Sequence, residues 1–303
     1  MARSAVIASA DAENAGQFST GDWGLFLGVS LIWGSSFLLI AEALEGLTPG
    51  VITLGRVGFG ALTLWALRLG RPATTRVSRE DRKQIIVLSF VWVAVPFTLF
   101  PLAQEHINSA VTGLLNGATP VFAGVVSALL VRVVPGGLQR IGILIGFAGV
   151  VLISLGSSSG GSTEILGVVL VLAATLCYGF AVNIAPPLQA KYGAVVLMSE
   201  VLGFATIWVL PFGLLSLPGA EFTVGPIAAV VFLGAIGTGM AYWIMATLVG
   251  RVGGVRASFI TYLIPVVSLI LGVTIRNDTV TAITIVGAVL TIGGAFIASR
   301  RAD

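Results

Sequence analysis

Long segments without a charged residue are the feature that most constrains how this chain can fold. Twenty-six uncharged residues separate Glu105 from Arg132, and 29 separate Glu221 from Arg251. A helix needs about 20 apolar residues to cross the roughly 30 Å hydrocarbon core of a bilayer. Each of these segments is therefore long enough to span a membrane. We expect ten transmembrane helices, over residues 22–42, 50–68, 84–103, 108–131, 138–155, 165–186, 194–216, 226–249, 255–275 and 279–298.

The composition excludes most soluble classes of protein. Charged residues make up 10% of the 303 residues and hydrophobic residues 56%, whereas an ordinary soluble domain is about 25% charged. So few charges cannot cover a soluble globule, so a cytosolic enzyme and a nucleic-acid-binding domain are excluded. The spans do not alternate apolar and polar residues, which argues against a transmembrane barrel. The sequence therefore predicts an all-α integral membrane protein.

The basic residues gather on one side of such a bundle. With ten spans, 14 of the 16 Lys and Arg residues lie on the side that holds both termini. The opposite side has only Arg276, and Arg56 lies inside a span. Because basic residues beside spans stay in the cytoplasm, we expect both termini there. Residues 1–21 are expected to form a mobile cytoplasmic tail, since their apolar run is too short for a signal peptide.

The two halves of the chain can be superposed at an offset of 145 residues, at which Pro120 meets Pro265. Each half has five spans, an odd number, so the second half enters the membrane from the opposite side. Inverted repeats are typical of transporters, whose substrate sites lie near the midplane between the halves. A duplication that serves folding alone is the alternative. We predict a first five-helix repeat over residues 22–157 and a second, inverted repeat over residues 163–300.

Glycines four residues apart recur in the spans. This spacing lets helix backbones approach closely. We interpret the pairs as internal helix packing rather than as dimer contacts, and both a monomer and a homodimer stay open. The pairs are Gly24/Gly28, Gly113/Gly117 and Gly142/Gly146.

Four parts of the sequence carry a resemblance to a known family. They are residues 33–37 (WGSSF), Arg56, residues 103–131 and residues 233–275. In this order, inside a ten-helix plan, they resemble the EamA-type permeases of the drug/metabolite transporter superfamily. The resemblance runs from about residue 22 to residue 299. It implies a transporter of the cell inner membrane, most simply an exporter of amino acids or related small metabolites that works by alternating access.

The chain departs from the family pattern after its two prolines. Members often carry a Gly-Glu pair thirteen residues after each proline, whereas this chain has Arg132-Val133 and Asn277-Asp278. A carboxylate at these positions therefore remains only as Asp278, in the second half.

Two proline-containing helices each have one polar face. Proline removes the hydrogen bond to the carbonyl four residues back, so the carbonyls of Asn116 and Thr261 are freed near mid-membrane. Such groups are tolerated only against protein or a watery cavity. We predict that both faces line a central cavity and that Pro120 and Pro265 are paired hinges; ordinary kinks are the alternative. The substrate-binding candidates are Asn116, Ser258, Thr261 and Tyr262 on these faces, and Trp33, Trp92, Tyr178 and Tyr242 as aromatic walls.

Two charges lie inside predicted spans. A charge at the bilayer centre costs roughly 2.5–3.5 kcal/mol on insertion scales, so it normally faces protein or water. Arg56 is a candidate to bind a substrate carboxylate or to brace a gate; the alternative is that it snorkels to the interface or pairs structurally. Glu200 is the sole carboxylate well inside a span, which makes it the candidate carrier for a coupling proton.

The sequence lacks the motifs of catalysis. It has no metal-ligand cluster, phosphate-binding glycine loop or nucleophile–base pair. We therefore expect no enzymatic activity, no metal and no cofactor, and as partners a small-molecule substrate and membrane lipid. Exchange of sugar phosphates or nucleotide sugars is an alternative, but these polyanions favour more than one buried cation. A lipid flippase or a non-transporting membrane scaffold is the alternative from another class.

Overall fold

The computed structural model describes residues 18–69, 77–131, 135–157 and 162–299. Most of the predicted tail, residues 1–21, lies outside these ranges. Ten helical stretches in the described residues are long and apolar enough to cross a membrane. They coincide with the ten predicted spans to within a few residues, so the all-α ten-span fold is confirmed.

Several spans of the first half are built from more than one helical segment. The first span bends at Ser35, and the fourth is interrupted at residues 117–118. The segments are α2 (Thr20–Gly34), α3 (Ser36–Ala43), α4 (Pro49–Leu69), α5 (Arg79–Leu88), the π-helix η1 (Ser89–Ala94), α6 (Val95–Gln104), α7 (Ser109–Asn116), α8 (Thr119–Val131) and α9 (Gly137–Ser157).

The second half repeats part of this pattern, although its first span is a single continuous helix. The eighth span of the chain contains a π-helix, and the ninth is interrupted at residues 258–259. The segments are α10 (Ser162–Ile184), α11 (Pro186–Tyr192), α12 (Ala194–Leu215), the 3₁₀-helix η2 (Leu217–Gly219), α13 (Val224–Gly234), the π-helix η3 (Ala235–Met240), α14 (Ala241–Val252), α15 (Gly254–Ala257), α16 (Ile260–Ile275) and α17 (Ala282–Ser299).

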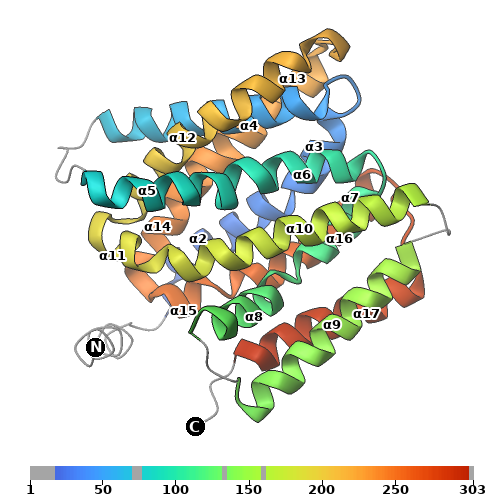
Figure 1. Ribbon diagram of the computed structural model, residues 1–303. Helices are drawn as coiled ribbons and strands as arrows, with labels where there is room; N and C mark the ends of the chain where they lie inside the picture. The colour runs from blue at the N-terminus through green and yellow to red at the C-terminus, as the bar shows by residue number, and fades with distance from the viewer. Residues whose placement is uncertain (1–17, 70–76, 132–134, 158–161, 300–303) are drawn as a thin grey trace.

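The last helices of the two halves, α9 and α17, lie side by side at one edge of the bundle, and α4, α12 and α13 lie at the opposite edge (Figure 1). Glycine makes the α9–α17 contact. A Cβ added to Gly149 would lie 2.5 Å from the Gly287 carbonyl oxygen, and one added to Gly294 would lie 2.6 Å from that of Gly142. The backbones touch, so internal packing is the role of these glycines.

The glycine pair of α2 does not follow this rule. A Cβ added to Gly24 or Gly28 would meet no atom within 4 Å. The prediction that this pair packs internally is therefore wrong. The spacing alone cannot distinguish a helix face that meets a neighbour from one that faces outward.

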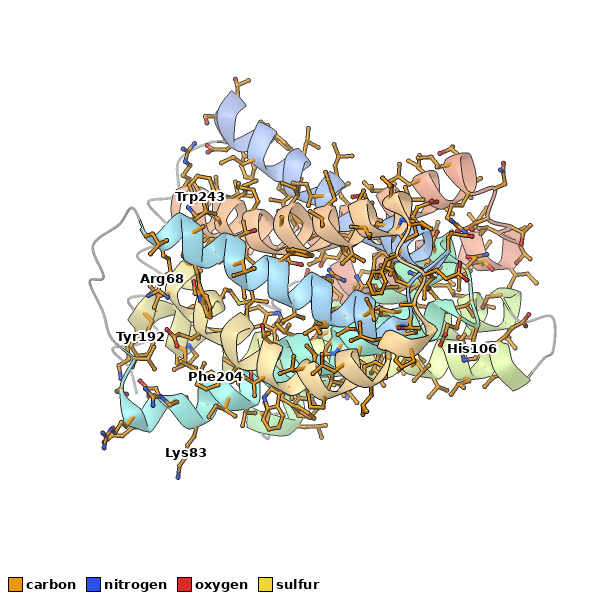
Figure 2. The ribbon with its side chains drawn as sticks, turned by 90° about the horizontal axis from the view of Figure 1, so that it is seen from above. Arg68, Lys83, His106, Tyr192, Phe204 and Trp243 are labelled. Carbon is orange, nitrogen blue, oxygen red and sulfur yellow. The ribbon has the colours of Figure 1, made fainter. Side chains whose placement is uncertain are left out.

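At each end of the bundle, polar contacts join the two halves of the chain. Arg68, Lys83 and Tyr192 lie at one end, which we call the Arg68 end, and His106 lies at the opposite end (Figure 2). At the Arg68 end, Lys191 contacts Asp81 at 2.5 Å. The His106 end has an ion triad in which Arg276 lies 2.7 Å from both Glu42 and Glu45.

Candidate functional site

The third and eighth spans each carry a π-helix at an equivalent position. Ser89, where η1 begins, and Ala235, where η3 begins, are 146 positions apart in the sequence, close to the offset that superposes the two halves. π-helical turns are rare and often occur at functional sites. Here η1 contributes Trp92 and η3 contributes Thr238, while Tyr242 follows η3 directly in α14. The two distortions therefore place side chains from both halves at the same level of the bundle as Arg56, whose guanidinium bonds to Thr238.

Arg56 of α4 is the centre of this region. Its side chain is buried, with 6% of the residue exposed. Its Nε donates a hydrogen bond to the Thr238 hydroxyl at 3.3 Å, and that hydroxyl donates to the Leu233 carbonyl at 3.0 Å. The guanidinium carbon lies 3.8 Å from the centre of the Phe97 ring, a cation–π contact. Thr238 thus holds the Nε group of the guanidinium, and Phe97 covers one of its faces.

Phe97 is held in place by α4 itself. Pro101 has no N–H to donate to the Phe97 carbonyl four residues back. The Thr53 hydroxyl, one turn from Arg56 on α4, lies 3.1 Å from this carbonyl. A polar side chain thus meets the backbone group that proline frees within the membrane. Helix α4 therefore positions both the Arg56 guanidinium and the Phe97 ring that lies against it.

Aromatic rings of both halves gather near the arginine. The Tyr242 ring lies 5.7 Å from that of Trp33 and 6.4 Å from that of Trp92. The phenols of Tyr178 and Tyr242 are the titratable groups that interact electrostatically with Arg56. Tyr178 also packs against both apolar core clusters of the molecule, so it lies at their junction. We call Arg56 and its surrounding rings the aromatic compartment: Arg56, Trp33, Trp92, Phe97, Tyr178 and Tyr242.

The predicted aromatic walls therefore come together, and each of the four keeps partial exposure. The polar face predicted on the ninth span is arranged differently. The Ser258 and Thr261 hydroxyls donate to nearby carbonyls of their own span. Tyr262 donates to the Ala295 carbonyl of α17 at 3.3 Å and packs against Phe296. These hydroxyls face the helix backbone and α17, because local carbonyls at the interrupted turn compete for them.

The interruption of the fourth span precedes Pro120 rather than centring on it. The Asn116 carbonyl, which Pro120 leaves free, accepts a hydrogen bond from the Thr119 hydroxyl at 2.8 Å. The Asn116 side-chain Oδ1 is buried without a hydrogen-bond partner among the described residues. Pro265 lies inside α16 and contacts Gly117, where a Cβ would lie 2.8 Å from the proline ring. The two proline regions thus meet each other directly.

Glu200 is not a buried charge, contrary to expectation. Its side chain is 39% exposed and lies 3.7 Å from the Arg68 guanidinium. It lines a groove between α4 and α12 with Trp65 and Gly203. Although Glu200 falls within a span, this part of α12 faces outward near the Arg68 end, and the arginine beside it supplies a counter-ion.

Two residues that contact Arg56 were missed in the sequence. Thr238 had a signal, since it is an isolated hydroxyl in the glycine-rich stretch GAIGTGM. Phe97 had none, because a phenylalanine in an apolar helix is most often core. Among the described residues no group of three or more His, Cys, Asp or Glu is arranged to hold a metal ion. The chemistry that this compartment offers is one fixed cation, aromatic faces and hydroxyls.

A model of the EamA-like transporter family matches residues 22–155 and 165–300. The chain belongs to the EamA-like transporter family. Its relatives include an uncharacterized transporter of Archaeoglobus fulgidus, 28% identical over 271 residues that cover 89% of this chain and 95% of the relative. A probable amino-acid metabolite efflux pump of Escherichia coli is 24% identical over 287 residues, which cover 90% of this chain and 93% of the pump.

The fold of this EamA-like transporter also occurs in a solved crystal structure. The TM-score is 0.63 at 19% identity, over 93% of this chain and 97% of the other. The family assignment and the ten spans establish a multi-pass membrane transporter. The family model matches the chain twice, in agreement with the paired π-helices and the internal repeat of the fold.

Proposed function

We propose that this EamA-like transporter exports amino acids or related small metabolites across the cell inner membrane by alternating access. The aromatic compartment carries the proposal, because both halves of the chain contribute rings to it and it contains a buried cation. The names of the Escherichia coli and Salmonella typhimurium relatives, both probable amino-acid metabolite efflux pumps, support the substrate class and the direction.

Alternating access requires contacts that break at one end while those at the other end hold. The chain has candidates at both ends. The Arg276 triad and the Asp278–Ser109 bond join the halves at the His106 end. At the Arg68 end, Lys191 pairs with Asp81, and Arg251 lies 3.4 Å from Asp22. In this proposal the two sets open in turn.

The proposed orientation places the Arg68 end in the cytoplasm. Arg68, Lys83 and Tyr192 gather there, while His106 is at the other end (Figure 2). Basic residues beside spans favour the cytoplasmic side. Substrate would therefore enter from the Arg68 end and leave through the His106 end.

A sugar-phosphate exchanger receives less support. Arg56 is the one buried Lys or Arg among the described residues. A phosphate monoester carries about two charges at neutral pH, and a single buried arginine would leave one of them without a counter-ion. A solute group with a single negative charge fits the compartment better.

Counterflow tests the proposal directly. Purified protein in liposomes loaded with one unlabelled L-amino acid is expected to accumulate the same labelled amino acid. Trp33→Ala in the compartment should abolish this accumulation. Trp23→Ala, on the same helix but half-exposed at its outer face, is the matched control and should retain it.

Accumulation of sugar phosphates alone, or lipid scrambling without accumulation of any solute, would contradict the proposal. Equal loss in Trp33→Ala and Trp23→Ala would contradict the site. Monodisperse elution of both variants in size-exclusion chromatography establishes that they are folded.

A further inference from the structure

The charge of Arg56 is not neutralised by any described residue. The guanidinium makes no ion pair with a described Asp or Glu, and its single hydrogen bond is the one from Nε to Thr238. A buried cation without a counter-ion is costly, and the cost is recovered when an anion binds. The compartment therefore favours the binding of an anion beside Arg56.

The geometry of the guanidinium specifies how an anion would bind. Phe97 covers one face of the group at 3.8 Å, and Thr238 occupies Nε. The edge that carries the two terminal nitrogens has no acceptor among the described residues. Two parallel N–H groups on one edge match the two oxygens of a carboxylate.

Among the described residues, no Asp or Glu interacts with Arg56, so no carboxylate there is placed to bind an amino group. The described carboxylates that form ion pairs do so with Arg68, Lys191, Arg251 and Arg276, away from Arg56. The titratable groups facing Arg56 are the phenols of Tyr178 and Tyr242, and a phenol is ordinarily neutral at physiological pH. An ammonium group in this compartment would share it with the like charge of Arg56.

We propose that Arg56 binds the carboxylate of the transported solute and that the compartment does not require the solute's amino group. The remainder of the solute packs against the rings of Trp33, Trp92 and Tyr242. The substrate class thus extends from amino acids to aromatic and aliphatic monocarboxylic acids, and it excludes amines and esters. This inference rests on the proposed transport function and names the chemical feature that its site recognises.

Four related probes test it in binding measurements on purified full-length protein by calorimetry. They are L-phenylalanine, 3-phenylpropionate, 2-phenylethylamine and L-phenylalanine methyl ester. Wild-type protein should bind the two carboxylates and neither the amine nor the ester. Arg56→Gln should weaken carboxylate binding by about 10-fold or more, the range for losing a charge-assisted bond. Arg56→Lys keeps the charge but loses the two parallel N–H donors. Its carboxylate affinity should therefore lie between those of the wild type and Arg56→Gln.

Arg68→Gln is the matched control, because Arg68 lies on the same helix at its exposed end. It should bind both carboxylates as the wild type does. Equal binding of the amine and the carboxylates, failure of the wild type to bind either carboxylate, or unchanged affinity in Arg56→Gln would overturn the inference. If Arg56→Gln does not fold, the wild-type ranking of the four probes and the Arg56→Lys result still decide.

Counterflow of the same probes separates this inference from the proposed function. Selective carboxylate binding without any counterflow would reject transport but retain the carboxylate site. Counterflow of 2-phenylethylamine at the rate of L-phenylalanine would retain transport and reject the carboxylate site.

Discussion

The Asp278 carboxylate accepts a hydrogen bond from the Ser109 hydroxyl at 2.5 Å. The same carboxylate oxygen accepts from the backbone N–H of Ala110 at 2.9 Å. A residue of the second half thereby caps the beginning of α7 in the first half. A carboxylate at a helix N-terminus is favoured by the unpaired N–H groups and by the helix dipole. This bond is one of the links between the halves at the His106 end.

Asp278→Ala should lower the free energy of unfolding by about 1–2 kcal/mol, the usual cost of losing a helix cap. The substitution would also remove the acceptor of the Ser109 hydroxyl, and because Ser109 is buried, water would not replace it. Denaturant unfolding in mild detergent measures the change. Glu105→Ala, an exposed carboxylate at the same end, is the control, and an equal effect of the two substitutions would contradict the assignment.

The α9–α17 contact predicts a contrast between glycines. Gly149→Ala places a Cβ against the backbone of α17, and overpacking of this kind costs typically about 1–3 kcal/mol. Gly28→Ala meets nothing within 4 Å, and replacing a helical glycine by alanine should stabilise the protein by about 0.4–1 kcal/mol. Thermal melts of the two variants should therefore shift in opposite directions, and shifts of the same sign would refute the packing described.

Lys191 gives a prediction about pH. Its hydrogen bond to Asp81, with a further one to Tyr192, raises the pKa of the lysine above its ordinary value of 10.5. A raised lysine pKa contributes stability that is complete below the ordinary value and is lost as the pH rises through the higher folded-state value. The melting-temperature difference between wild type and Lys191→Met should therefore stay constant from about pH 7 to 9 and shrink only above 10.5. A difference that shrinks between about pH 7 and 9 would contradict this pairing.

Glu200 should be dispensable for transport. It is partly exposed and pairs with Arg68 at 3.7 Å, and exposed pairs contribute about 0–1 kcal/mol. Glu200→Gln should keep wild-type counterflow and the wild-type dependence of its rate on pH. A rate that no longer responds to pH in this variant would instead make Glu200 the proton carrier.

The ten spans could be predicted from the sequence because hydropathy is a local property. A stretch of about 20 apolar residues without a charge has one stable arrangement in a bilayer. The grouping of Trp33, Trp92, Tyr178 and Tyr242 was also predicted, because these rings lie away from the membrane interfaces where Trp and Tyr usually collect.

What could not be predicted depends on the rotation of each helix about its axis. Arg56 and Glu200 occupy similar positions in equivalent spans, yet one faces the compartment and the other an outer groove. In the third and eighth spans, the π-helices η1 and η3 also change the rotation of the helix within the span, and no periodicity in the sequence marks them. The hydrogen-bond partners of the Ser258 and Tyr262 hydroxyls could not be predicted for a related reason, because carbonyls within their own span and on α17 compete for them.

The most direct test of the central claim is labelling of a single cysteine in the compartment. Tyr242→Cys in a Cys177→Ser background leaves one thiol, since Cys177 is the only native cysteine. A membrane-impermeant thiol reagent is added to one face of oriented vesicles and then, in a separate sample, to the other. The account predicts labelling from both faces, slowed by L-phenylalanine, with loss of counterflow on modification. Labelling from one face only, or full counterflow after complete modification, would contradict it.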